Sequence, residues 1–224
     1  MNQIKLMVFD MAGTTIKEDN VVYKTIHQTL TDNNIDISLE DVLKHGAGKE
    51  KLTAIKEILA LKEIKQDGLA ERIFELFKTA LEQNYNNYDI KAFNGTKPTF
   101  DALKVQDIKI ALNTGYNRET ATKLLERVNL KVGKDIDVLI TADDVEKGRP
   151  YPDMIIKAMK DTGVSSADYV VKIGDSVIDI EEGKSANCKY TVGLTSGAQN
   201  ADQLQTAQPD YIFDTIEEVL TIIK

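Results

Sequence analysis

Two aspartates of this chain directly follow apolar segments and could do chemistry there. Asp10 ends the run IKLMVFD, and Asp175 comes just after the apolar segment from Tyr169 to Ile173. Apolar, β-branched runs with little alternation are typical of central parallel strands that are covered on both faces. In open α/β sheets ligands bind outside the carboxyl ends of the strands, so both carboxylates are expected at one edge of a sheet.

Carboxylates in such a position suit phosphoryl transfer. Asp10 can attack a phosphoryl group and form an aspartyl-phosphate. Asp175 would share a divalent cation with it, and Asp179 lies one helical turn beyond Asp175 on the same face. Three neighbouring carboxylates repel one another unless a cation lies among them. Mg²⁺ prefers hard oxygen ligands, often one or two carboxylates with water and substrate phosphate, so we expect Mg²⁺ as the cofactor.

Three sequence blocks carry a resemblance to a known family. They are DMAGTT from Asp10, GRPYPD from Gly148 and KIGDSVID from Lys172. Together they resemble the haloacid dehalogenase superfamily of phosphoryl-transfer hydrolases. Within it, the first two blocks look most like the phosphonoacetaldehyde hydrolase (phosphonatase) branch. The resemblance implies a hydrolase that acts on a small phosphonate or phosphate ester.

The same resemblance assigns roles to individual residues. The backbone carbonyl of Ala12 would be a further metal ligand, and the hydroxyl of Thr114 would donate to the phosphoryl group. Arg149 stands where the wider superfamily usually has a lysine, and its planar fork can hold phosphate bidentately. The predicted catalytic residues of the core are therefore Asp10, Thr114 and Arg149, and the predicted metal ligands are Asp10, Ala12, Asp175 and Asp179.

Position 12 separates two classes of substrate. Phosphatases of the superfamily usually carry a second aspartate two residues after the nucleophile, where it protonates the leaving alkoxide. This chain has Ala12 there, and a methyl group cannot donate a proton. In the phosphonatase branch the leaving group is a carbon, which a lysine activates as a Schiff base with the substrate aldehyde. Ala12 therefore favours cleavage of a P–C bond.

The candidate for that lysine is Lys49. The segment GAGK at residues 46–49 resembles the family's block of a glycine, two residues and a lysine in the substrate loop. Other lysines, Lys44, Lys51 and Lys56, are close by, and a solvated lysine near a helix start is the simpler interpretation of Lys49. The predicted substrate-binding residues are Gly13, Thr14, Gly115, Arg149 and Lys49.

Two departures from the family's pattern keep other functions open. Leu52 stands where a histidine is expected after the lysine, and Met11 replaces a tryptophan that is common after the nucleophile. One alternative is a phosphomonoesterase for small phosphorylated metabolites, which would need a good leaving group or another proton donor. A second alternative is a module that keeps the metal site without turnover, although the core residues for catalysis are all present.

The remaining pattern predicts an α/β fold with a doubly wound parallel sheet and an inserted helical cap. From Asn94 onward, segments with helical and strand periodicity alternate, as in right-handed βαβ units. Between residues 19 and 88 the apolar residues recur at helical spacing, with Asp19 or Asn20 able to cap the first helix. We therefore expect a core domain of residues 1–18 and 89–224 and a cap domain of residues 19–88.

Composition narrows the partners and the compartment. The 224 residues carry a net charge of -8, which disfavours nucleic acid and anionic membrane surfaces as partners. The one cysteine, Cys188, excludes an internal disulfide and fits a reducing cytoplasm. No apolar run is long enough to cross a bilayer, and the first residues lack the regions of a signal peptide. We expect a cytoplasmic monomer or homodimer.

Overall fold

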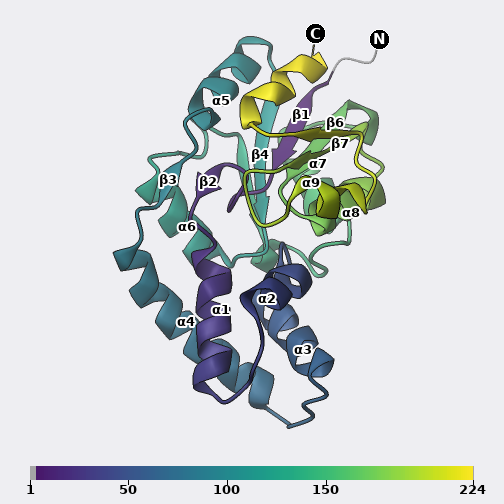
Figure 1. Cartoon of the computed structure of the whole chain (residues 1–224). Coiled ribbons are helices and arrows are strands. Elements are labelled where there is room, and N and C mark those ends of the chain that lie inside the picture. The colour runs from purple at the N-terminus through teal and green to yellow at the C-terminus, as the bar shows by residue number, and fades with distance from the viewer. Residues whose placement is uncertain (1–3, 224) are drawn as a thin grey trace.

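The computed structural model describes residues 4–223 and divides them between a sheet domain and a group of helices (Figure 1). The sheet has six strands in the order β5-β4-β1-β6-β7-β8, and every neighbouring pair is parallel. The predicted α/β class with a doubly wound parallel sheet is therefore confirmed. The strands are β1 (Leu6–Phe9), β4 (Lys109–Thr114), β5 (Val138–Thr141), β6 (Val170–Gly174), β7 (Tyr190–Leu194) and β8 (Tyr211–Phe213).

The central strand β1 is buried along its whole length because both faces of the sheet are covered. Leu6 and Val8 pack into a cluster that includes α7, whereas Met7 and Phe9 pack into a larger cluster that includes α5 and the segment η3. Successive strand side chains point to opposite faces, so an unbroken apolar run serves both clusters. The surrounding elements are α5 (Thr96–Val105), α6 (Arg118–Arg127), η1 (Ala142–Asp144), α7 (Asp153–Thr162), η2 (Ala167–Tyr169), α8 (Val177–Ser185), α9 (Ala201–Gln205) and η3 (Ile216–Ile223).

Four helices lie together below the sheet in Figure 1. The chain enters them through β2 and returns through β3, which pair as a short antiparallel ribbon. Asn20 is the N-cap residue of the first helix, but its φ of 58° is left-handed and its side chain makes no capping bond, unlike the predicted cap. The elements are β2 (Ile16–Lys17), α1 (Val21–Asp32), α2 (Leu39–Gly46), α3 (Lys51–Leu61), α4 (Leu69–Asn87) and β3 (Lys91–Ala92).

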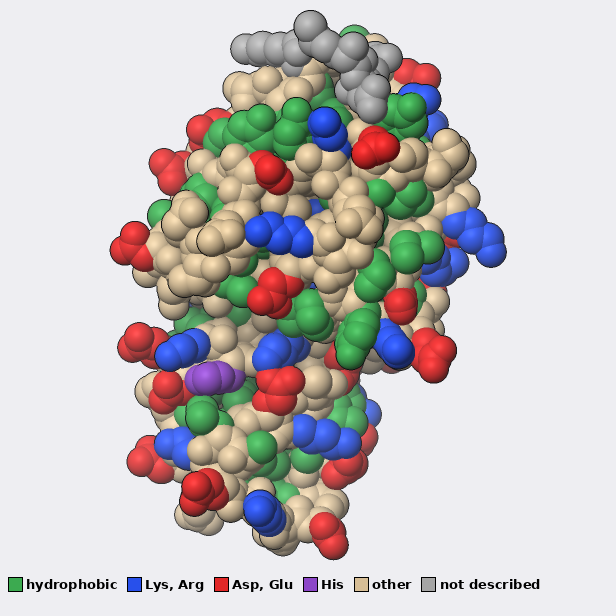
Figure 2. All heavy atoms as spheres, turned by 90° about the vertical axis from the view of Figure 1, so that its right-hand side faces the viewer, with side chains coloured by type: hydrophobic (Ala, Val, Ile, Leu, Met, Phe, Trp, Pro, Cys, Tyr) green, Lys and Arg blue, Asp and Glu red, His purple; other side chains and the backbone are tan. Residues whose placement is uncertain are grey.

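The predicted cap boundaries at residues 18/19 and 88/89 fall in the connections beside β2 and β3. Each helix of this group is amphipathic, and their apolar faces pack on one another within the larger core cluster. Among residues 4–223, no helix has the length and apolar character that crossing a membrane requires. On the face shown in Figure 2, acidic and basic side chains are interspersed.

Phe100 provides a test of the sheet core. It is fully buried on α5, and its ring centroid lies 5.3 Å from that of Phe9 on β1. We expect Phe100→Ala to lower the free energy of unfolding by about 3–5 kcal/mol, because the substitution leaves a cavity between the helix and the sheet. Val105→Ala on the same helix, 88% exposed, should change it by less than about 0.5 kcal/mol in the same chemical denaturation measurement.

Candidate active site

Three neighbouring strands end at the candidate site. Asp10 follows β1, Thr114 ends β4 on one side of it, and Asp175 follows β6 on the other. The chain runs from β1 to β4 and later returns to β6, so the strand order reverses about β1. Ligand sites of open α/β sheets occur at such a reversal. All three side chains are buried, with exposed fractions between 3% and 6%.

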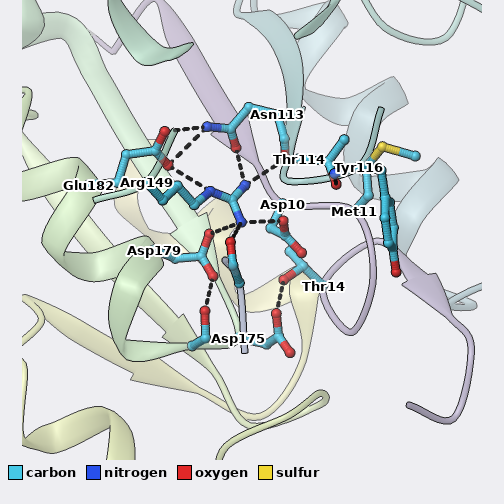
Figure 3. Close-up of polar contacts among 12 residues, drawn as sticks. Asp10, Met11, Thr14, Asn113, Thr114, Tyr116, Arg149, Asp175, Asp179 and Glu182 are labelled. Carbon is cyan, nitrogen blue, oxygen red and sulfur yellow. Dashed lines mark hydrogen bonds and ion pairs between the residues drawn. The ribbon is translucent and has the colours of Figure 1, made fainter. Parts of the chain in front are cut away.

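The guanidinium of Arg149 lies at the centre of this cluster (Figure 3). Its Nη1 is 2.7 Å from Oδ1 of Asp10 and 3.0 Å from Oδ1 of Asp179. Its Nε donates to Glu182 at 3.1 Å, and its Nη2 donates to the backbone and side-chain oxygens of Asn113 at 2.7 and 2.8 Å. The fork that was expected to hold phosphate bidentately is therefore occupied by protein oxygens. Its direct effect here is to orient Asp10 and to neutralise buried carboxylates.

Lys172, Glu182 and Asn113 belong to this network but were not among the predicted site residues. Lys172 is fully buried on β6, and its Nζ lies 2.8 Å from Asp179, 2.9 Å from Asn113 and 3.5 Å from Glu182. The sequence alone could have indicated this network, because a lysine inside an apolar strand is a buried charge and a buried charge requires a partner. Glu182 lies one helical turn beyond Asp179, so the same helix face presents both acids.

The structure brings Asp10 and Asp175 together as candidate metal ligands, whereas Asp179, which shares the Arg149 Nη1 with Asp10, is paired with cationic side chains. Asp179 accepts from Lys172 and from the hydroxyl of Ser176, and it pairs with Arg149. Burial by itself would raise its pKa, but Arg149 and Lys172 outweigh burial and lower it. In residues 4–223 no three acidic, histidine or cysteine side chains are grouped as a metal site. In this arrangement the predicted third carboxylate ligand is an ion-pair partner of Arg149 and Lys172.

The surroundings of Asp175 fit a small divalent cation. Burial and the neighbouring Asp10 and Asp179 carboxylates raise the pKa of Asp175 well above its usual value, a repulsion that a bound cation would offset. A Cβ on Gly13, whose φ is +85°, would come within 2.3 Å of Asp175 Oδ2, so only glycine permits this approach. Asp10, Ala12 and Asp175 line one pocket. The two carboxylates, with the carbonyl predicted as a ligand, would form an oxygen-only donor set of the kind that Mg²⁺ prefers.

Thr14 and Thr114 differ in what their hydroxyls contact. Thr14 Oγ1 donates to Asp175 at 3.2 Å and so fixes a candidate ligand, rather than facing the substrate as predicted. Thr114 Oγ1 accepts from the backbone N–H of Tyr116 at 3.2 Å and lines the same small pocket as Asp10. Because this hydrogen bond uses the oxygen as an acceptor, the hydroxyl proton can be donated to a bound group.

The side chain of Lys49 is not brought into the site. Its Nζ pairs with Glu57 on α3, and only its backbone carbonyl faces the core loop. Lys51, two residues further along, is 6% exposed and lines the pocket that contains Asp10 and Ala12. Burial lowers the pKa of Lys51 to about 8, although the nearby Asp10 and Glu18 carboxylates act in the opposite direction. A nucleophilic amine near neutral pH needs such a shift.

The loop before α3 closes directly over the site. Arg149 Nη1 lies 3.4 Å from the carbonyl of Gly48, and a Cβ on Gly115 would lie 2.9 Å from the carbonyl of Lys49. The pocket around Asp10 has a volume of only about 10 Å³, which is room for about one water. A cavity of about 840 Å³ between α4 and α6 adjoins it, and Lys51, Gly115 and Tyr116 line both.

Comparison with known proteins identifies the family. Residues 7–192 match the model of the family described as haloacid dehalogenase-like hydrolase. This match covers most of the chain, so the protein belongs to that family and is a hydrolase of the haloacid dehalogenase superfamily. The resemblance stated from the sequence blocks is thereby confirmed, and a module that has lost turnover is not the interpretation that the family supports.

Individual relatives span almost the whole chain. A phosphonoacetaldehyde hydrolase of Bacillus cereus is 28% identical over 238 residues, covering 97% of this chain and 87% of the relative. The pyrophosphatase PpaX of Oceanobacillus iheyensis is 25% identical, and the match covers 98% of this chain and 97% of the relative. Among solved structures, a phosphonoacetaldehyde hydrolase-like protein from Oleispira antarctica has a TM-score of 0.85 at 22% identity, covering 99% of this chain and 91% of its own. The last likeness concerns the fold alone.

Lys172 provides a test of the charge network. Replacing it with methionine keeps most of the length of the side chain but leaves Asp179 and Glu182 without one of their two buried cations. We expect Lys172→Met to lower the free energy of unfolding by about 3–5 kcal/mol. As a control, Lys157→Met removes a more exposed ion pair with Asp161 and should lower the free energy of unfolding by less than about 1 kcal/mol. Equal losses in urea denaturation would contradict the network.

Proposed function

We propose that this hydrolase cleaves the P–C bond of a small phosphonate that carries an aldehyde, such as phosphonoacetaldehyde. The observation that carries the proposal is that a nucleophilic carboxylate and a buried amine, Asp10 and Lys51, line one small site. Ala12 is the third element, because it removes the acid that an alkoxide leaving group needs. The relatives named phosphonoacetaldehyde hydrolase support the same chemistry.

The two groups divide the reaction between them. The Lys51 amine attacks the aldehyde carbon, water leaves, and a protonated imine forms. Asp10 then attacks phosphorus, and the electron pair of the breaking P–C bond passes into the imine, which becomes a neutral enamine. Protonation of the enamine carbon and hydrolysis of the imine release acetaldehyde and free Lys51. Water releases phosphate from the aspartyl-phosphate and restores Asp10.

The core residues prepare the phosphoryl half of this reaction. Asp10, Asp175 and the carbonyl of Ala12 would hold Mg²⁺, which supplies charge neutralisation at the phosphoryl oxygens when bound. Arg149 fixes the Asp10 carboxylate from one side, at 2.7 Å. The hydroxyl of Thr114 donates to a phosphoryl oxygen. The closed loop excludes water, which protects the imine and the acyl-phosphate from early hydrolysis.

A phosphatase for small phosphorylated metabolites, either a phosphomonoesterase or a pyrophosphatase, is the second candidate, because the relatives include a pyrophosphatase whose match covers 98% of this chain. The leaving group of a pyrophosphate is itself a phosphate, which departs more readily than an alkoxide. The site could therefore serve such a substrate with Ala12 in place. This candidate assigns no role to the buried amine of Lys51, and for that reason the phosphonatase proposal is favoured.

Replacement of two lysines tests the assignment. Phosphate and acetaldehyde release from phosphonoacetaldehyde with Mg²⁺ should fall to background in Lys51→Ala, because no imine forms. Lys49→Ala is the matched control and should keep most of the activity, since its amine pairs with Glu57 outside the pocket. Asp10→Asn is the blank. Full activity in Lys51→Ala, or loss only in Lys49→Ala, would overturn the role of Lys51.

Installing an acid at position 12 tests the choice of leaving group. We expect Ala12→Asp to raise the hydrolysis of small phosphomonoesters by roughly 10²–10⁴-fold, the usual contribution of a general acid. Cleavage of phosphonoacetaldehyde should not rise with it, because its leaving group is activated by the imine. Steady-state phosphate release from both substrates gives the comparison. Unchanged ester hydrolysis would mean that Ala12 does not limit the native enzyme toward esters.

A further inference from the structure

A short loop between β7 and α9 lies against the candidate metal site and has no role in the reaction described so far. It consists of residues 196–199, with the sequence SGAQ, and we call it the SGAQ loop. Each of its four residues contacts one of the segments that carry the candidate ligands or the start of α8. These contacts are the basis of the inference.

The loop fixes the carboxylate of Asp175 by a hydrogen bond. The backbone N–H of Ala198 donates to Oδ2 of Asp175 at 2.6 Å, and the hydroxyl of Thr14 donates to Oδ1 at 3.2 Å (Figure 3). An ionised carboxylate has about four lone-pair sites, so each oxygen keeps one site for a cation. The two donors come from different loops and together set the rotation of the carboxylate while leaving it able to bind a metal.

The same carboxylate lies between two glycines. A Cβ on Gly197 would come within 2.0 Å of Asp175 Oδ2, and a Cβ on Gly13 would come within 2.3 Å of the same oxygen and 2.9 Å of the Gly197 Cα. Gly13 also has a left-handed φ, whereas Gly197 does not. Glycine at position 197 is therefore required by the close approach of Asp175 and not by backbone conformation.

Ser196 connects the loop to the other segment of the donor set. Its hydroxyl donates to the carbonyl oxygen of Gly13 at 2.7 Å. Gly13 directly follows Ala12, whose carbonyl is the predicted ligand, and the N–H of Gly13 donates to the carbonyl of Ile16 at 2.8 Å. Both backbone polar groups of Gly13 are thus fixed, one of them by the SGAQ loop. The loop therefore joins the segments that carry Asp175 and Ala12.

The loop is itself anchored at both ends. Ser176 is the N-cap residue of α8, but its hydroxyl donates to Asp179 at 2.5 Å and makes no capping bond. The N–H of Val177 is instead accepted by the side-chain oxygen of Gln199 at 2.6 Å, and Gln199 is 8% exposed. At the other end, the backbone N–H of Thr195 donates to the last residue of β8 at 3.0 Å. The sheet and α8 therefore hold the loop in place.

We propose that the SGAQ loop is the positioning element of the metal site, which holds the Asp175 carboxylate and the Gly13 backbone in place before the cation binds. No atom of the loop is itself a ligand in this proposal. The inference rests on the Mg²⁺ site of the proposed function, but not on the choice between a phosphonate and a phosphate substrate. Groups that orient metal ligands typically change metal affinity by about 10–100-fold, and we expect an effect of that size here.

The experiment measures metal binding without turnover. Mn²⁺ is the probe, because it suits the same carboxylate, carbonyl and water ligands as Mg²⁺. Metal-free protein is titrated with Mn²⁺, and electron paramagnetic resonance of the free ion gives the Kd. Gly197→Ala should raise the Kd by roughly 100-fold, because its Cβ displaces Asp175. Ser196→Ala should raise it by roughly 10-fold, because the carbonyl of Gly13 loses its anchor.

The neighbouring residue provides a matched control. Thr195→Val removes a hydroxyl that donates to the exposed Asp214 at 2.7 Å, away from the candidate ligands, and should leave the Kd for Mn²⁺ unchanged. The melting temperature of each metal-free variant, followed by circular dichroism, separates a loss of stability from a loss of affinity. Ser196→Ala removes one hydroxyl and introduces no clash, so it keeps the test available even where Gly197→Ala folds poorly.

The results separate this inference from the proposed function. A wild-type Kd in both Gly197→Ala and Ser196→Ala overturns the role of the loop, and a lower melting temperature alone would make the loop merely structural. Weakening of the same size in Thr195→Val overturns it as well. Equal Mn²⁺ binding by the wild type and Asp175→Asn would mean that the metal site of the proposed function is wrong. Failure of the wild type to cleave phosphonoacetaldehyde would overturn the substrate assignment alone.

Discussion

The structure depends on the compensation of charge where the central strands end. Asp10, Asp179 and Glu182 are buried within one cluster, and each contacts the single guanidinium of Arg149. Removing an isolated carboxylate from water is costly unless it is paired and hydrogen-bonded. Arg149 and Lys172 supply that pairing from a loop and a strand that lie far from Asp10 in the sequence. The core can therefore hold a fully buried nucleophile only when these segments are folded against one another.

The candidate site is shared between the sheet and the helices. The sheet contributes Asp10 and Asp175, the proposed nucleophile and metal ligands, and Ala12 in place of the usual acid. The helical group contributes Lys51, which reaches the same pocket from the start of α3. Contact between Gly115 and the loop carbonyl of Lys49 is close enough that a side chain there would clash. The two halves of the proposed reaction are thus assembled only when the loop lies against the core.

Much of this arrangement could be predicted from local patterns. The apolar runs before Asp10 and Asp175 indicated buried parallel strands, and the sheet places them as neighbours. The helical periodicity of residues 19–88 corresponds to α1 through α4. A lysine inside the β6 run and a glutamate one turn after Asp179 were visible signals of the buried network, although they were not interpreted. The left-handed conformation of Asn20 and the 3₁₀ conformation of η3 were not predicted from these patterns.

The sequence by itself determined the sheet and the carboxylates that end its strands, because strand periodicity and the residues that end a strand are local properties. The resemblance to the family rested on three sequence blocks, DMAGTT, GRPYPD and KIGDSVID. Tertiary structure decided which of two lysines faces the pocket. Lys49 and Lys51 are separated by one residue, and the turn that leads into α3 directs the first toward Glu57 and the second between Tyr23 and Tyr116. Tertiary structure also decided the contacts of Asp179, because the cations that pair with it come from other segments of the chain. Side-chain direction and charge pairing are properties of the packed molecule, and no spacing along the chain records them.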